Sequence, residues 1–261
     1  MTFEQLTANT SIGKVSYYKG GSGHPLIYIH SENGFFHNGA IKELIKKFQV
    51  FIPIIPGFEN TNFIESLNSI EDLSSLVSVF MDEVISVTKI DIIGYSLGAN
   101  IAAKFAVDFP DKLDQVIFIS PYGFDEGGIE RPAKTKKSLS KYYEKFEEKS
   151  FSIASFEKDV FAKYNIKNYD KKLISDLESS NSLKLVLLGT EDKITSSEVG
   201  HKLRALLKNI HFIYIYDSGN AIEIDQPERM IKIIEDFLLR GEAFIVNWEG
   251  RSEEESPKRD N

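Results

Sequence analysis

Hydrophobic residues recur along the chain with two spacings, one typical of strands and the other of helices. Short runs rich in β-branched and aromatic residues predict strands at 14–20, 25–30, 50–55, 90–93, 115–120, 183–189 and 211–216. Apolar positions three and four residues apart predict helices at 41–48, 69–85, 97–109, 197–208 and 227–240. Ser69 precedes an acidic first turn and is the expected N-cap of the helix at 69–85. This order predicts an α/β protein with a mostly parallel central sheet and helices on both faces.

The spacing of the predicted strands and the local composition also predict the domain organisation of the chain. The strands at 14–20 and 25–30 are too close for a crossover helix, so we expect them to form an antiparallel edge. A turn-rich and then Lys/Glu-rich stretch at 122–181 predicts a helical insertion between two core strands. The expected division is therefore a core at 1–121 and 182–245, a helical cap at 122–181, and a polar tail at 246–261. The charge and polarity of that tail are typical of disorder.

Composition excludes several classes of function. The chain has 261 residues, 42% of them hydrophobic, which suits one domain with a large core. It has no cysteine, and its five scattered histidines lack metal-ligand spacing, so we expect no metal and no cofactor. A net charge of -8 predicts no nucleic-acid partner. No apolar run is long enough to span a bilayer and no signal segment is visible, which predicts no membrane partner and a cytoplasmic location. The sequence does not indicate an oligomeric state.

A candidate nucleophile lies between the predicted strand at 90–93 and the predicted helix at 97–109. The stretch "GYSLG" at 94–98 fits the pattern G-x-S-x-G, in which Ser96 occupies a strained strand-to-helix turn. The following helix would direct unpaired N–H groups at an oxyanion formed beside the serine. The alternative is a tight turn with a small capping serine, which the strand–helix context disfavours.

With these motifs the chain resembles the α/β-hydrolase fold superfamily, in particular its helical-cap branch of small esterases, lactonases and carbon–carbon bond hydrolases. The resemblance runs from about residue 10 to 240 and rests on "PLIYIHSENGFF", "PIIPGFENT", "IIGYSLGAN", "LVLLGTEDKI" and "DSGNAIEIDQPERM". It implies an α/β-hydrolase fold, Ser96 as nucleophile, Asp192 as the orienting acid and a small-molecule substrate or ligand. Glu191 is adjacent to Asp192 and fits the family pattern less well.

The resemblance also implies an oxyanion hole made by the backbone N–H groups of Glu32 and Leu97. The family usually has His-Gly where this chain has His30-Ser31. Backbone donors tolerate many side chains, so Glu32 can still serve. Its own carboxylate would oppose an oxyanion unless it turns away from the site. His30 is interpreted as a structural residue that forms hydrogen bonds within the loop.

The family's histidine position holds Asn220 in this chain. An amide can donate to Asp192 and accept from Ser96, but it cannot take a proton at neutral pH. Four explanations stay open. The first is that the Asn is natural and the protein binds a ligand without catalysis, and the second is that the Asn is an engineered substitution. The third is that His37 or Glu32 acts as the base, and the fourth is that the reaction needs no strong base. Elsewhere in the chain His201 and His211 are interpreted as structural.

Phe35, Phe36, Tyr95 and Tyr122 are candidate substrate-binding residues beneath the cap, and a role as ordinary core aromatics is as plausible for each of them. The leading hypothesis is a serine hydrolase acting on an ester, lactone, amide or related bond of a small molecule. The alternative is a ligand-binding pseudo-hydrolase that serves as a sensor or interaction module. A cofactor-independent lyase or oxygenase is disfavoured, because those groups generally use the histidine as well.

Overall fold

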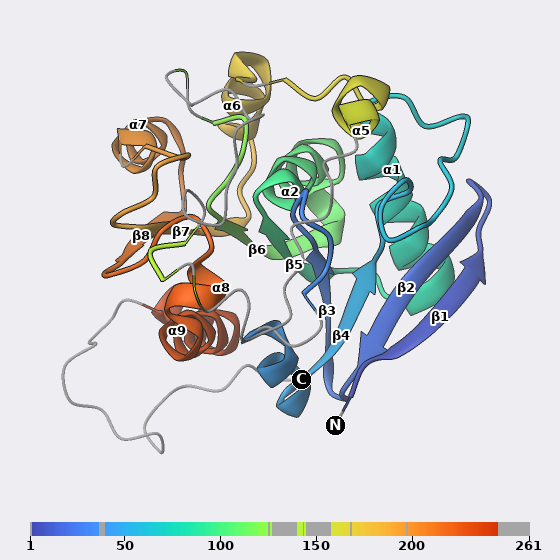
Figure 1. The fold of residues 1–261 in the computed structure, drawn as a ribbon, viewed down its shortest axis with the longest axis horizontal. Helices are drawn as coiled ribbons and strands as arrows, with labels where there is room; N and C mark the ends of the chain where they lie inside the picture. Colours follow the sequence, from blue (N-terminus) through green and yellow to red (C-terminus); the bar gives the residue numbers. More distant parts are fainter. Residues whose placement is uncertain are drawn as a thin grey trace.

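One eight-stranded sheet forms the centre of the molecule in the computed structural model, which describes residues 2–36, 40–124, 126, 140–142, 144, 158–167, 169–196 and 198–244 (Figure 1). Its strands are β1 (Glu4–Asn9), β2 (Lys14–Gly20), β3 (His24–Ile29), β4 (Phe48–Pro53), β5 (Ile90–Tyr95), β6 (Leu113–Ile119), β7 (Leu183–Gly189) and β8 (Ile210–Ile215). They lie in the order β1-β2-β4-β3-β5-β6-β7-β8. Every pair from β4 to β8 is parallel, whereas β1–β2 and β2–β4 are antiparallel. The predicted mostly parallel sheet is confirmed.

The prediction that the strands at 14–20 and 25–30 form an antiparallel pair is wrong. β2 does not pair with β3, because β4 lies between them, antiparallel to β2 and parallel to β3. The turn between β2 and β3 passes close to the start of β4: Gly21 has φ 76°, and a Cβ there would lie 2.2 Å from the Phe48 carbonyl oxygen. The edge is instead made by β1, which the hydrophobic pattern did not predict because its residues are mostly exposed and polar.

The helices form two layers, one on each face of the sheet, each with its own hydrophobic cluster (Figure 1). One face carries α1 (Ile70–Phe80), α2 (Leu97–Asp108), α5 (Lys158–Lys163), α6 (Lys171–Leu177) and α7 (Glu198–Leu206). The other carries the 3₁₀ helix η1 (Ala40–Lys46), α8 (Ile222–Asp225) and α9 (Pro227–Arg240). Short turns of helix also occur as η2 (Met81–Ile85), η3 (Pro110–Lys112) and η4 (Gly241–Ala243). The predicted helices on both faces are therefore present.

The prediction that Ser69 is the N-cap residue of the helix at 69–85 is confirmed. Ser69 is extended, with φ -147°, and its side chain accepts a hydrogen bond from the Asp72 N–H at 3.1 Å. The helix is α-helical only to Phe80 and continues as the π turn η2. It ends at Ser86, which has a left-handed φ of 61°.

The helices α5 and α6 of the predicted cap at 122–181 pack on the helical layer that contains α2. Helix α6 contacts α2, and the buried side chain of Tyr164, which follows α5, belongs to the same hydrophobic cluster. The Tyr164 hydroxyl donates to the Pro56 carbonyl at 2.8 Å. The division into core and cap stays a prediction, and the predicted tail at 246–261 lies outside the described residues.

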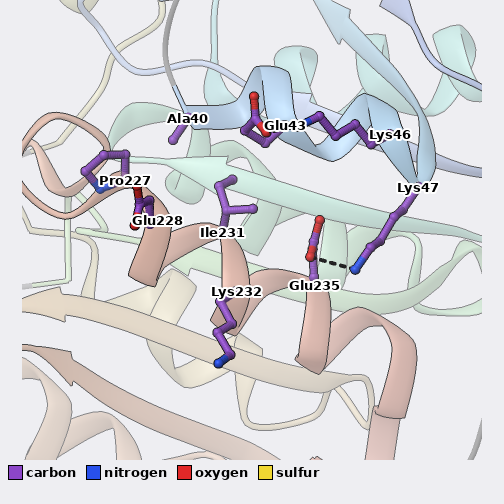
Figure 2. A pocket seen from close by; sticks show the side chains of 9 residues that line it. All are labelled: Ala40, Glu43, Lys46, Lys47, Pro227, Glu228, Ile231, Lys232 and Glu235. Carbon is purple, nitrogen blue, oxygen red and sulfur yellow. Dashed lines mark hydrogen bonds and ion pairs between the residues drawn. The ribbon is translucent and has the colours of Figure 1, made fainter. Parts of the chain in front are cut away.

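A surface groove of about 380 Å³ separates η1 from α9 (Figure 2). Beside the groove, Lys47, which follows η1, forms an ion pair with Glu235 of α9 at 2.9 Å. The charged residues that line the groove are three lysines and three glutamates, namely Lys46, Lys47, Lys232, Glu43, Glu228 and Glu235. Because these charges balance, the lining is typical of a solvated surface. No described helix is long and apolar enough to cross a membrane.

Candidate active site

Ser96 lies at the junction of β5 and α2, at the carboxyl edge of the sheet. Its backbone has φ 53° and ψ -106°, a conformation that a non-glycine residue holds only when its surroundings impose it. Its N–H donates to the Ile119 carbonyl at 2.9 Å. A Cβ on Gly94 would lie 2.3 Å from the Gly98 carbonyl oxygen, and one on Gly98 would lie 2.1 Å from the Ile29 carbonyl oxygen. Both glycines are therefore needed for the turn that holds the serine.

Asp192 and Asn220 form a direct pair where the loops after β7 and β8 meet. The Asn220 side-chain amide donates to Asp192 Oδ2 at 3.0 Å. The other carboxylate oxygen accepts the N–H groups of Ile194 at 2.7 Å and Thr195 at 2.9 Å. Because a carboxylate can only accept, Asn220 must turn its nitrogen to Asp192 and keep its oxygen as an acceptor. The pair is therefore an acid and a neutral amide.

The electrostatic environment of Asp192 is set by opposing effects. Burial raises the pKa of Asp192 above its ordinary value, while hydrogen bonds from Thr195, Ile194, Asn220 and Ser120 act in the opposite direction. None of these donors carries a charge. A cationic imidazolium at position 220 would therefore be strongly favoured beside this buried carboxylate.

The backbone of Asn220 is held in place by two hydroxyl groups. Its carbonyl accepts hydrogen bonds from the Tyr95 hydroxyl at 2.8 Å and from the Ser120 hydroxyl at 3.1 Å. Burial, followed by the negative charge of Glu223, raises the pKa of Tyr95 well above its ordinary value, so this hydroxyl stays a donor. These contacts place the loop after β8 relative to β5 and β6.

The structure brings Glu32 and Leu97 together through the side chain of Glu32. The Leu97 N–H donates to Glu32 Oε2 at 3.3 Å, and both residues are buried. The carboxylate has therefore turned toward the site. One of the two expected oxyanion donors is occupied by a negatively charged group of the chain itself. The role expected for the backbone N–H of Glu32 remains a prediction.

Both ring nitrogens of His30 form hydrogen bonds to backbone groups. Nε2 accepts the Ile55 N–H at 3.0 Å, so Nδ1 carries the proton and donates to the Ser31 carbonyl at 2.7 Å. Burial lowers the pKa of His30, because protonation would place a charge away from water and remove the acceptor for Ile55. This geometry agrees with the structural interpretation of His30.

We expect acidification to destabilise the protein through His30. Below about pH 6.5 the unfolded histidine takes up a proton that the buried ring resists, so the free energy of unfolding falls by up to about 1.4 kcal/mol per pH unit. Urea unfolding at pH 7.5 and 5.5 measures this loss. A His30→Asn variant should depend less on pH, whereas the exposed His201 replaced by Gln should leave the dependence unchanged. Equal dependence in all three proteins would assign the effect to other groups.

The aromatic candidates are distributed over different environments. Phe35 packs against the rings of Phe3, Tyr18 and Tyr28 in the core. Phe36 lies in a small cluster with Ala221, Ile224 and Ile194, next to the loops of Asp192 and Asn220. The Tyr122 N–H donates to the Ser96 carbonyl at 3.2 Å, and its ring contacts Phe161. A substrate-binding role stays a prediction for Phe35, Phe36, Tyr95 and Tyr122, and the proposed alternative base His37 lies outside the described residues.

Asp225, which no motif in the sequence indicates, joins the loop of Asn220 to the segment at 140–142. Its buried carboxylate accepts the N–H groups of Gly219 at 2.7 Å, Lys141 at 2.8 Å and Tyr142 at 3.1 Å, and also the Ser140 hydroxyl. The acidic residues of "AIEIDQPERM" were the available signal, but sequence alone does not show which of them is buried.

Two ion pairs extend this connection to the loop of the acid. Lys141 pairs with Glu191, the neighbour of Asp192, and with Asp217, which precedes Asn220 by three residues. The Tyr142 hydroxyl donates to Asp217 as well. The segment at 140–142 therefore holds both loops of the Asp192–Asn220 pair.

Replacing Asp225 with Asn should lower the free energy of unfolding by about 2–4 kcal/mol, because an amide nitrogen would face buried N–H donors and leave them without an acceptor. Urea unfolding measures the loss. Asp217→Asn is the matched control: that carboxylate is partly exposed, so its removal should cost less than about 1 kcal/mol. Equal losses in the two variants would show that Asp225 has no special role.

The described residues contain no group of three or more His, Asp or Glu side chains able to hold a metal ion. The candidate groups that the structure describes at the site are Ser96, the Asp192–Asn220 pair and the Leu97 N–H. All of these follow the carboxyl ends of parallel strands, the usual position of a site in such a sheet.

Comparison with known proteins bears on the fold of the chain. The family described as alpha/beta hydrolase fold matches residues 24–153. Over 110 residues the chain is 27% identical to the dihydrolipoyllysine-residue acetyltransferase component of the acetoin cleaving system of Cupriavidus necator, covering 41% of this chain and 29% of that protein. It is 28% identical over 105 residues to an uncharacterized protein of Mycobacterium tuberculosis, covering 40% of this chain and 30% of the other. The chain thus spans less than a third of either relative.

Solved structures resemble the chain over most of its length. A thermophilic esterase from Thermogutta terrifontis has a TM-score of 0.74 at 19% identity, covering 90% of this chain and 98% of the other. A carboxylesterase from Bacillus subtilis has a TM-score of 0.74 at 15% identity, covering 91% and 92%. A meta-cleavage product hydrolase from Pseudomonas fluorescens has a TM-score of 0.71 at 17% identity, covering 89% and 97%. At these identities the similarity concerns the fold.

Proposed function

The chain belongs to the α/β-hydrolase fold superfamily, and we propose that it is a serine-hydrolase-type protein that takes an ester, lactone, amide or related small molecule at Ser96. In this proposal Ser96 is the nucleophile and Asp192 is the acid. The observation that carries it is the strained, glycine-flanked turn that holds Ser96 beside the start of α2. Such a turn is retained at an energetic cost, which is typical of a functional residue.

Asn220 determines how far this chemistry can proceed in the protein as it stands. Its amide oxygen can accept a hydrogen bond from the serine hydroxyl, but it cannot hold the proton while the serine attacks. In the serine protease subtilisin, loss of the base costs about 10⁶ in turnover. We therefore propose that the protein binds such molecules well and turns them over slowly.

The reactivity of Ser96 tests the proposal. The protein and its Ser96→Ala variant are treated with a fluorophosphonate probe, and labelling is followed by mass spectrometry. Slow labelling confined to Ser96, and lost in Ser96→Ala, is the expected result. If the Asn220→His variant is also unlabelled, although folded, Ser96 is not a nucleophile and the proposal is wrong.

A second candidate function is a ligand-binding pseudo-hydrolase, used as a sensor or interaction module. The contact between the Leu97 N–H and the Glu32 carboxylate favours it, because that contact occupies a donor that catalysis would need. Under this function the site around Ser96 binds its ligand without covalent chemistry. Binding that is equal in the protein and in Ser96→Ala, with no labelling in either, would support this candidate.

A further inference from the structure

The backbone N–H of Leu97 begins helix α2 and is a donor that the helix itself leaves without an acceptor. Helices often satisfy such donors with the side chain of the preceding residue, but the side chain of Ser96 makes no capping hydrogen bond. Glu32 supplies the acceptor instead, with its Oε2 3.3 Å from the Leu97 nitrogen. The contact joins the loop after β3 to the residue that follows the nucleophile.

The Glu32 carboxylate accepts from the same N–H group that would stabilise an oxyanion beside Ser96. A carboxylate at the positive end of a helix is stabilised by the helix dipole. The oxygen of an attacked ester also becomes negative, and it needs the same N–H group. Since both are negatively charged acceptors, they compete for the Leu97 N–H.

The loop that carries Glu32 is fixed independently of this contact. The Gly34 N–H donates to the Ser31 carbonyl at 3.0 Å, and the Asn33 N–H donates to the Ser31 hydroxyl at 3.2 Å. The Phe35 N–H donates to Glu59 Oε1 at 2.8 Å. None of these bonds involves the side chain of Glu32. The backbone of the loop therefore keeps these bonds when the Glu32 side chain is displaced or replaced.

We propose that the Glu32 side chain is an internal occupant of the oxyanion hole, and that a ligand oxygen reaches the Leu97 N–H only by displacing it. This inference rests on the proposed function, because it requires a ligand whose carbonyl oxygen lies beside Ser96. It makes Glu32 a specificity-determining residue. Ligands with a carboxylate at this position are excluded while Glu32 is in place, and neutral carbonyl compounds are admitted when their other groups bind well enough.

Two consequences distinguish this role from simple capping of α2. Removing the Glu32 side chain should open the hole to small anions, whereas loss of a cap alone would only lower the melting temperature. Removal should also tighten the binding of phenylboronic acid: the Ser96 oxygen adds to the trigonal boron, the hydroxyl proton is released to solvent, and the tetrahedral adduct is negatively charged. A hydrogen bond to such a charged group typically changes affinity by about ten-fold or more.

The test follows the Leu97 backbone amide resonance by NMR during titration with acetate. In Glu32→Ala the resonance should move as acetate binds, and in the unmodified protein it should stay unchanged. Glu32→Gln keeps the size of the side chain without its charge and should admit acetate weakly. Glu65→Gln, which removes an exposed carboxylate outside the site, is the matched control and should behave like the unmodified protein.

If the Leu97 amide resonance does not move with acetate in a folded Glu32→Ala protein, the inference is overturned. Phenylboronic acid separates that failure from failure of the proposed function. Acetate binding in Glu32→Ala together with boronate binding that tightens about ten-fold over the unmodified protein supports both. Acetate binding without boronate binding in any variant supports the role of Glu32 and counts against Ser96 as a nucleophile.

Discussion

Replacing Asn220 with histidine should raise the turnover of a short-chain p-nitrophenyl ester by about 10⁴-fold or more. In the structure the side-chain nitrogen of Asn220 already donates to Asp192 at 3.0 Å. In histidine, Nδ1 is attached to the same Cγ position and would take over this bond. The proposed function requires the distal Nε2 to reach the Ser96 hydroxyl and accept its proton. Beside the buried Asp192 carboxylate the resulting imidazolium is stabilised, so the missing base is restored.

The measurement is the steady-state rate of ester hydrolysis with matched variants. Asn220→Gln also lengthens the side chain but cannot take a proton, so it should give no gain. Adding Ser96→Ala or Asp192→Asn to Asn220→His should remove most of the gain, because the three residues act together. A folded Asn220→His protein that is no faster than the unmodified one would contradict the proposed arrangement.

The elements of the fold were predictable where burial is strong on both sides of the sheet. β5 and β7 are buried along almost their whole length and are mostly apolar, apart from Asp91 and Lys184, which is typical of central parallel strands. β1 lies at an edge with exposed polar side chains, so its pattern carries no such signal. The order of strands was harder to predict, because the insertion of β4 between β2 and β3 depends on a close backbone approach at Gly21 and not on hydrophobic spacing.

The same distinction applies to the candidate site. The motif around Ser96 and the family pattern around Asp192 and Asn220 could be identified because they are local in sequence. The direction of the Glu32 side chain could not, since it depends on how the start of α2 lies against the loop after β3. Asp225 was missed for a similar reason: its partners at 140–142 come from a segment about 85 residues away.

Of the two glycines beside Ser96, Gly98 is the one at which α2 closely approaches the end of β3. Gly98→Ala should lower the free energy of unfolding by about 3 kcal/mol and slow the labelling of Ser96. A Cβ at this position would lie 2.1 Å from the Ile29 carbonyl oxygen and 2.8 Å from that of His30. Both atoms belong to the backbone, so no change of rotamer relieves the overlap. The start of α2 must move away from the loop of Glu32, and the Leu97 N–H moves with it.

Gly200→Ala is the matched control for this prediction. Its Cβ would also lie 2.1 Å from a neighbouring atom, but that atom is the hydroxyl oxygen of Tyr214, at the end of a side chain. A small rotation of the tyrosine relieves the contact, and alanine has a higher helix propensity than glycine, so little stability should be lost. Urea unfolding and fluorophosphonate labelling, both in the Asn220→His background, measure the two effects. If Gly98→Ala and Gly200→Ala have the same free energy of unfolding and the same labelling rate, the packing of α2 on the loop after β3 does not control the site. We expect the two variants to differ clearly, because backbone atoms cannot move aside as a tyrosine side chain can.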